Sequence, residues 1–154
     1  MKKSINIIFT LIILCAMSVA FAEEKATKEE CVAKCKEVAE MIKKIGIEAT
    51  IKAVQDPKGS FVWKDTYVFL MDSKANVLAH PVIPKLVGQN WSGKADADGK
   101  MFVDEYIMVS QKSGEGWVDY VWPKPNEKTT SPKTSFVYKV PNVDVIAIAG
   151  IYLN

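Results

Sequence analysis

The sequence GEGWVDYVWPKP, residues 114–125, places three large aromatic side chains and a carboxylate on a short stretch closed by prolines. In a strand, alternate side chains point to opposite faces. One face would carry Trp117, Asp119 and Val121, and the other Val118, Tyr120 and Trp122. Because Tyr and Trp combine an apolar body with a polar group, such a strand suits the wall of a pocket for a small ligand with one charged end. A core strand whose rings only pack together is the alternative.

Ahead of this stretch the pattern predicts helices. Thr27 followed by Glu30 forms a capping box. Apolar side chains then recur at spacings of three and four, at Cys31, Cys35, Val38, Ile42 and Ile45. We expect a long amphipathic helix that Gly46 bends or interrupts, and a second helical piece over 47–55.

The remaining elements alternate between strand and helix signals. Residues 66–71 and 77–80 flank a turn-forming segment and predict a hairpin. Asp98 is placed to cap a helix over 99–112, with Phe102, Tyr106 and Val109 on one apolar stripe. Strands are expected over 117–122, 134–140 and 143–152, with the polar stretch 124–133 as a loop. The short connections favour an α+β fold, with a five-stranded antiparallel sheet and helices on one side.

Five strings in order carry a resemblance to a known family. They are the opening stretch, FVWKDTYVF (61–69), VLAHPVIPKLVGQN (77–90), DADGK (96–100) and PKTSFVYKV (132–140). Together they resemble the single Cache family of extracytoplasmic ligand-sensing domains. The resemblance implies a PAS-like five-stranded sheet with a long N-terminal helix packed across it. It also implies ligands such as short carboxylates or amino acids.

The first residues have the layout of a secretory signal peptide. Lys2 and Lys3 precede an apolar run over 5–17, and Ala20, Phe21 and Ala22 provide a cleavage site. We expect cleavage after Ala22, a single domain over 23–154, and a periplasmic or secreted location. Lipidation at Cys15 and an uncleaved anchor are the alternatives, although the apolar run is short for a membrane span.

Charge and composition exclude several classes of function. The formal charge is +2, and removing Lys2 and Lys3 makes the remaining domain neutral. The chain contains no arginine, which argues against nucleic-acid binding. With a single histidine, His80, the sequence predicts neither a zinc site nor a catalytic acid–base pair, so no metal, cofactor or enzyme activity is expected. Asp96 and Asp98 lack the further acidic ligands of a calcium loop.

His80 and one lysine are the candidates for anchoring a charged ligand. Pro81 holds His80 extended at the end of a strand, where it meets a ligand or is satisfied by the backbone. A lysine facing inward would define a carboxylate subsite, because a buried ammonium needs an anion. Lys133, at the position of the basic residue in the family's PKxS-type segment, is preferred to Lys139.

Aromatic residues complete the predicted site. Tyr67, Tyr120 and Trp122 are expected around the ligand, with Trp63 and Met101 as walls and Trp117 packing under the helix. Cys31 and Cys35 lie on one helical stripe. They stay buried and reduced, form a strained internal bridge, or link two chains into a homodimer.

The leading hypothesis is therefore a binding domain for a small organic acid or amino acid. The chain ends soon after its last strand, so the sequence predicts no membrane-crossing output of its own. We expect either a free binding protein or a partner to a separate membrane receptor. The alternative is a ligand-free module of the same fold that dimerises or docks through its N-terminal helix.

Overall fold

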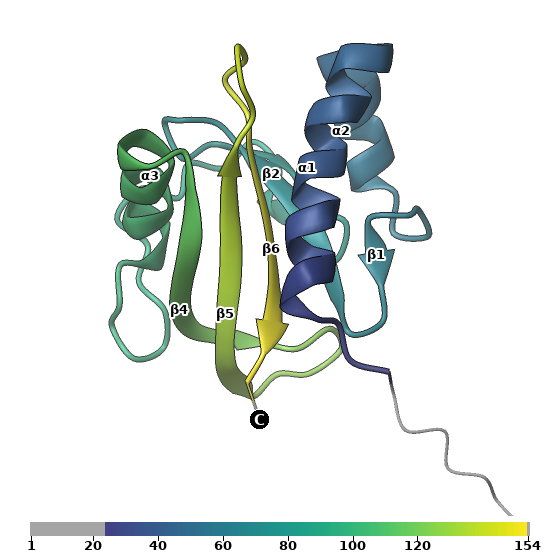
Figure 1. Cartoon of the computed structure of the whole chain (residues 1–154). Helices are drawn as coiled ribbons and strands as arrows, with labels where there is room; N and C mark the ends of the chain where they lie inside the picture. The colour runs from purple at the N-terminus through teal and green to yellow at the C-terminus, as the bar shows by residue number, and fades with distance from the viewer. Residues whose placement is uncertain (1–23, 154) are drawn as a thin grey trace, which may run out of the picture.

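The computed structural model describes residues 24–153, which form three helices, a short 3₁₀ turn and six strands (Figure 1). The helices are α1 (Lys28–Ile45), α2 (Ile47–Gln55) and α3 (Phe102–Lys112), and the 3₁₀ turn is η1 (Pro84–Leu86). The strands are β1 (Val62–Trp63), β2 (Thr66–Met71), β3 (Val77–Ala79), β4 (Glu115–Pro123), β5 (Thr130–Lys139) and β6 (Ile146–Tyr152).

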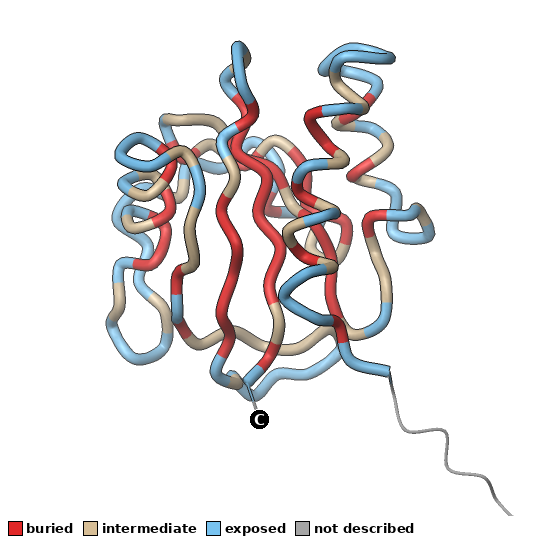
Figure 2. The backbone as a smooth tube through the Cα atoms, in the orientation of Figure 1, coloured by how far each residue is buried: buried red, intermediate tan, exposed pale blue. Residues whose placement is uncertain are grey.

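All strand pairs of the sheet are antiparallel. Its order is β1-β2-β6-β5-β4, and β3 pairs with the other end of the β2 edge. The predicted hairpin is confirmed, because Leu70 of β2 lies opposite Ala79 of β3. The two central strands, β5 and β6, are buried along most of their length, as Figure 2 shows. The predicted five-stranded antiparallel sheet is confirmed, with the two-residue β1 as an additional strand.

The helices cover both faces of the sheet, so the prediction that they share one side is wrong. α1 packs on β5, β6 and β2, whereas α3 packs on β4 and β5. Along β5, Phe136 belongs to the apolar cluster under α1, and the next residue, Val137, belongs to the cluster under α3. Each strand therefore contributes alternate side chains to two cores. The sequence pattern did not reveal that the 22-residue connection between β3 and α3 crosses to the other face.

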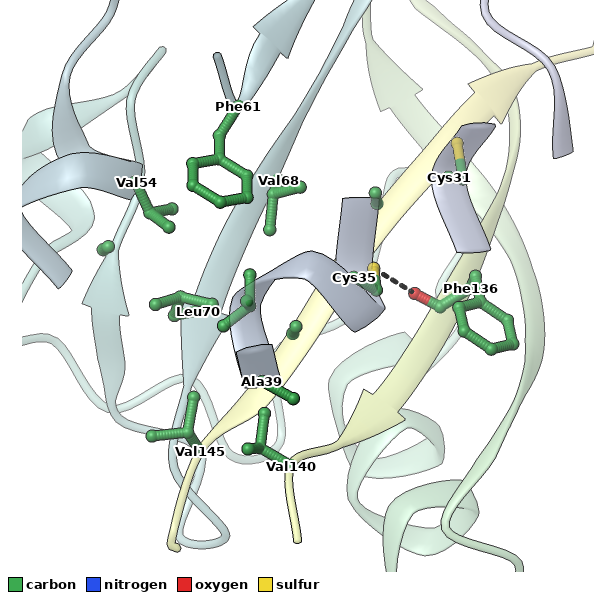
Figure 3. Packing of buried hydrophobic residues seen from close by; sticks show 14 residues of the cluster. Cys31, Cys35, Ala39, Val54, Phe61, Val68, Leu70, Phe136, Val140 and Val145 are labelled. Atoms are coloured by element: carbon green, nitrogen blue, oxygen red, sulfur yellow. Dashed lines mark hydrogen bonds between the residues drawn. The ribbon is translucent and has the colours of Figure 1, made fainter. Parts of the chain in front are cut away.

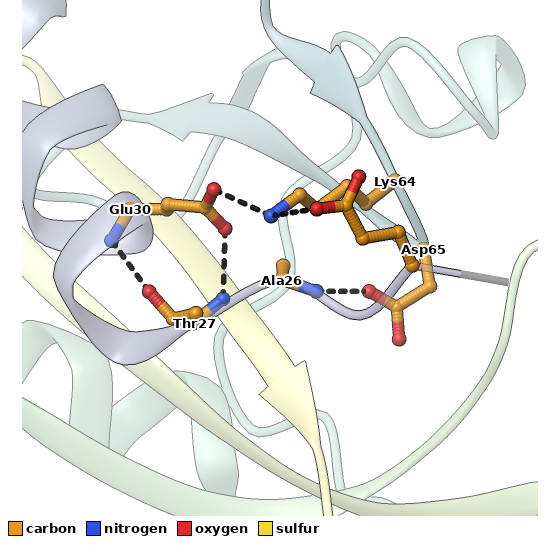
Figure 4. Close-up of polar contacts among 6 residues, drawn as sticks. Ala26, Thr27, Glu30, Lys64 and Asp65 are labelled. Atoms are coloured by element: carbon orange, nitrogen blue, oxygen red, sulfur yellow. Dashed lines mark hydrogen bonds and ion pairs between the residues drawn. The ribbon is translucent and has the colours of Figure 1, made fainter. Parts of the chain in front are cut away.

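The start of α1 is fixed as the sequence predicted. The backbone N–H of Glu30 donates to Thr27 Oγ1 at 3.2 Å, and the N–H of Thr27 donates to Glu30 Oε2 at 2.9 Å (Figure 4). Lys64 adds an ion pair to Glu30 at 2.6 Å, and Asp65 accepts the N–H of Ala26 at 2.8 Å. These contacts tie the helix to the turn between β1 and β2. Gly46, with φ of 83°, separates α1 from α2 as expected.

The apolar stripe of α1 covers the sheet. Cys31, Cys35 and Val38 are fully buried, and Figure 3 shows both cysteines among the core side chains. Both thiols are free and buried, so the described chain has no internal bridge between them, and a bridge between two chains stays a prediction. Towards the end of the helix the stripe leaves the sheet, and Ile45 is exposed. The first half of this stripe therefore packs against the sheet and is not exposed for contact with a second chain.

Two predicted boundaries differ from the structure. The helix α3 begins at Phe102 with Met101 as its N-cap residue, and no side chain caps it, so Asp98 is not the cap. Asp96 instead accepts the backbone N–H groups of Asp98 and Lys100. β5 begins at Thr130, so Lys133 lies inside a strand rather than in the predicted loop.

The predicted signal peptide, the cleavage site and Cys15 lie outside the described residues. Within residues 24–153, no helix is long and apolar enough to cross a membrane.

Candidate functional site

The candidate site lies on the face of the sheet that α3 covers. Lys133 of β5 has Tyr120 of β4 opposite it on one side and Tyr152 of β6 on the other. Two residues along β5, Ser135 faces Gly150 of β6. A Cβ atom at Gly150 would come within 2.1 Å of Ser135 Oγ and 2.4 Å of the Thr134 carbonyl oxygen, so only glycine allows this close approach. The strand register therefore brings a cation and several hydroxyl groups together.

Lys133 is the central polar residue of this face. Its side chain is 2% exposed, and its Nζ atom lies 3.3 Å from the Tyr152 hydroxyl. The Nζ atom also lies 4.7 Å from the centre of the Tyr67 ring and 4.5 Å from that of the Tyr152 ring. None of the ion pairs found in residues 24–153 includes Lys133. Burial without a partner anion lowers the pKa of Lys133 to about 7.

His80 is held at the end of β3, and its imidazole is almost fully buried. The Gln55 side chain accepts the His80 N–H at 2.8 Å and donates to its carbonyl oxygen at 3.1 Å. The N–H of Ile83 donates to Nδ1 at 3.0 Å, so in the neutral ring Nε2 carries the proton. Burial, reinforced by the charge of Lys133, lowers the pKa of His80 to about 3. His80 is therefore a neutral hydrogen-bond donor at physiological pH.

Aromatic rings fill most of the space between α3 and the sheet. Phe102 of α3 stacks on Tyr120, with ring centres 4.7 Å apart and planes 3° apart. Trp91, from the connection before α3, lies 5.7 Å from Trp122. The cavity that remains has a volume of about 20 Å³, room for about one water molecule. Its walls are formed by Phe69, Met71, Val77, His80, Leu86, Trp91, Phe102, Val103, Tyr106, Tyr120 and Trp122.

The hydroxyl groups near the cavity differ in their hydrogen bonds. Tyr120 and Ser135 bond to each other at 3.0 Å, and Tyr152 donates to the Pro123 carbonyl oxygen at 2.8 Å. The Tyr106 hydroxyl is buried beside the Tyr120 and Ser135 hydroxyls, although it meets neither in full hydrogen-bond geometry. Burial raises its pKa well above the usual value, so it stays a neutral donor and acceptor.

The structure brings together five of the seven residues predicted for the site. Tyr67, His80, Tyr120, Trp122 and Lys133 all lie on the α3 side of the sheet or at its edge. Met101 does not join them, because it precedes α3 and is 52% exposed. Trp63 packs against the cluster under α1, on the opposite face. Trp117 also packs against that cluster, beside Phe136, as predicted.

Sequence reasoning missed other residues that contact the same space. Tyr106 was recognised only as part of the apolar stripe of a helix, and Phe69 and Tyr152 only as strand residues. Trp91 lies in a connection with no periodic pattern, so no sequence signal pointed to it. The stripe containing Tyr106 was a usable signal, but the pattern did not show which face of the sheet it would meet.

A group of three or more His, Cys, Asp or Glu side chains that could hold a metal ion is not found among residues 24–153. The Asp96 carboxylate, considered for calcium, accepts N–H groups from three backbone positions, including Val121 at 2.9 Å. What the site offers is one buried amine, one neutral imidazole and several hydroxyls beside apolar walls.

The family model described as Single Cache domain 2 matches residues 1–154. The chain belongs to the single Cache domain family. Its relatives include a sensor histidine kinase, MctS of Rhizobium johnstonii, which is 33% identical over 59% of this chain and 20% of that protein. A methyl-accepting chemotaxis protein, McpP of Pseudomonas putida, is 30% identical over 58% of this chain and 16% of that protein. The chain thus matches a fifth or less of these signal-transduction proteins.

Solved Cache structures share the fold. A periplasmic sensor domain of a chemotaxis protein is 26% identical, with 82% of this chain and 90% of that chain covered and a TM-score of 0.67. A Cache chemosensory domain described as recognising carboxylic acids is 23% identical, with 82% and 88% covered and a TM-score of 0.66. The domain is therefore a Cache sensor-type fold, similar to periplasmic domains of chemotaxis proteins.

Proposed function

We propose that this Cache domain binds a short monocarboxylate, held by the ammonium group of Lys133. The observation that carries the proposal is a lysine that is 2% exposed and has no ion pair among those of the described residues. A buried ammonium is costly unless an anion pairs with it. A small carboxylate would supply that anion, and the aromatic walls would enclose its carbon chain.

The ligand would be small, and binding would require the site to open. A cavity of about 20 Å³ cannot hold an organic acid with its present side chains. Trp91 and Trp122 are partly exposed and contact each other, so they are the rings that would move first. His80 would donate its Nε2 proton to the ligand, while Tyr67 would give up part of its contact with Lys133.

A thermal melting screen of residues 23–154 against short monocarboxylates, dicarboxylates and amino acids tests the proposal. A ligand present at about a hundred times its dissociation constant should stabilise the domain by about 2.7 kcal/mol. Lys133→Met should abolish the response to monocarboxylates. Lys139→Met is the matched control, because Lys139 lies on the same strand but is exposed. An equal response of the wild type and Lys133→Met would overturn the role of Lys133.

The nearly filled cavity favours a second candidate, a module of the same fold that binds no ligand and acts by docking or dimerising through α1. Exposed Ile45 and Ile47 at the junction of α1 and α2 would be part of that surface. If no small molecule in the screen shifts the melt, this candidate replaces the first.

We further propose a periplasmic or secreted location after cleavage following Ala22, with a separate membrane receptor as partner. The similarity to a periplasmic sensor domain supports the location. The two curated relatives support the partner, because most of each lies outside the matched region and one is a kinase. Mass spectrometry of the exported protein, which should begin at Glu23, tests the cleavage.

A further inference from the structure

We propose that the outer face of α2 binds a second copy of this chain, so that two domains form a twofold-symmetric dimer through α2. The dimer does not depend on which small molecule the domain binds, because the groove that it uses and the cavity under α3 share no residue.

An open groove lies between α2 and the connection that follows β3. Its volume is about 440 Å³. Its apolar walls are Ile51 of α2, Leu78 of β3, and Pro84 and Val87 in and after η1. Pro84 and Val87 are exposed. Apolar surface that is gathered in one hollow and open to solvent marks an interaction site.

The same face of α2 carries an apolar side chain that projects into solvent. Ile47, in the first turn of α2, is 38% exposed, and the junction of α1 and α2 is exposed in Figure 2. Ile47 and Ile51 are four residues apart, so they share one stripe of the helix. A twofold axis sets a projection of each copy over a hollow of the other. Ile47 of each copy then fills the groove of its partner.

The charges beside this stripe favour a second copy as the occupant of the groove. Glu48 and Lys52 are exposed and one helical turn apart, and none of the ion pairs among residues 24–153 includes either. When two copies of α2 pack antiparallel, the acid of each meets the base of the other. A partner of a single charge sign would meet one favourable and one unfavourable group.

Net charge does not oppose the association. Without Lys2 and Lys3 the domain has a formal charge of zero, because the remaining lysines and acids are equal in number. Two copies therefore approach each other without long-range repulsion.

Sedimentation velocity of the exported protein over a series of concentrations tests the proposal. The wild type should form a dimer. Ile47→Asp should weaken that dimer about a hundredfold, because it places a carboxylate in each of two apolar grooves. Met108→Asp is the matched control, since Met108 is an exposed apolar residue of another helix, α3, and should leave the dimer unchanged.

Charge exchange tests whether two copies meet through this face. Glu48→Lys and Lys52→Glu should each weaken self-association about tenfold, because both contacts of the dimer become repulsive. An equal mixture of the two variants should form a mixed dimer with about the affinity of the wild type. In the mixture, the two lysines of one chain face the two glutamates of the other.

Three results would overturn the proposal. The first is a wild type that stays monomeric up to about 1 mM. The second is a mixture of the charge variants that associates no better than either variant alone. The third is a dimer that Ile45→Asp dissociates and Ile47→Asp leaves intact, since its interface would lie on α1. None of these results bears on the response to organic acids in the melting screen, so the proposed function is tested separately.

Discussion

Lys133 is the buried cation of the candidate site, because its position on β5 directs its side chain into the core. Its strand position, rather than its chemistry, makes it buried. Cys31 of α1 and Asp65 before β2 interact electrostatically with Lys133, and Lys133 in turn acts on His80 after β3. Three tyrosines lie beside it: Tyr67 of β2, Tyr120 of β4 and Tyr152 of β6. Burial lowers its pKa to about 7, and none of the salt bridges among residues 24–153 joins an acid to this lysine.

This pKa predicts a stability that rises with pH above neutrality. Lys133 titrates at about 7 in the folded domain and at about 10.4 when unfolded, so between these values the unfolded chain binds more protons. The free energy of unfolding should therefore increase from pH 7 to pH 9, by at most about 1.4 kcal/mol per pH unit. Above pH 9 the buried Cys31 thiol, whose pKa burial raises to about 12, acts in the opposite direction.

Urea unfolding at pH 7, 8 and 9 measures this dependence. Lys133→Met should flatten it, while Lys139→Met should keep the wild-type slope. A slope that is the same in the wild type and Lys133→Met would show that another group titrates in this range.

The connection from β3 to α3 is the element that closes the site. It contributes His80, Leu86 and Trp91 to the cavity wall. Asp96 fastens it to the sheet edge, because one carboxylate accepts the backbone N–H groups of Asp98, Lys100 and Val121 at 2.8–3.0 Å. Lys100 adds a contact to the Asp119 carbonyl oxygen and an ion pair with Glu105 at 2.8 Å.

Removing the Asp96 hydrogen bonds should loosen the attachment of the β3–α3 connection to the edge of the sheet. Asp96→Ala deletes the acceptor of three charge-assisted hydrogen bonds and should lower the free energy of unfolding by about 2 kcal/mol. Hydrogen exchange should become faster at the amides of Lys100 and Val121. Asp98→Ala is the control, because no hydrogen bond of the described chain uses the Asp98 carboxylate; equal effects of the two variants would rule out the fastening role.

The domain as a whole is a sheet with two separate cores. The core under α1 and α2 contains Cys31, Cys35, Val38 and Phe61, all fully buried. The core under α3 contains the cavity, and Lys133 is buried on the same face of the sheet. One face of the sheet therefore serves stability, and the other also carries the candidate site.

This division predicts where a ligand changes the dynamics. The best ligand of the melting screen should slow hydrogen exchange in α3, in β3 and in the connection between them, because these elements close around it. The amides of α1 should change little. Protection confined to α1 and α2 would place the binding site on the other face and contradict the location proposed above.

Local patterns in the sequence were sufficient for several features. The Thr27 and Glu30 capping box, the interruption at Gly46 and the division of Trp117 from Tyr120 follow from contacts or periodicities within a few residues. The five ordered strings also led to the correct family, and with it to the long helix across an antiparallel sheet. Such features depend on neighbours in the chain, so the sequence contains what is needed to predict them.

Only the tertiary structure decided what covers each face. Periodicity showed that Tyr106 shares a stripe with Phe102, but not that the stripe would meet β4 and β5 opposite α1. It could not show that Met101 stays in solvent, that Trp63 joins the other core, or that Lys133 is buried without an anion. Periodicity also could not predict the size of the cavity. These features depend on how segments far apart in the chain pack together, because side-chain burial and its energetic consequences are set by contacts between elements rather than along one of them.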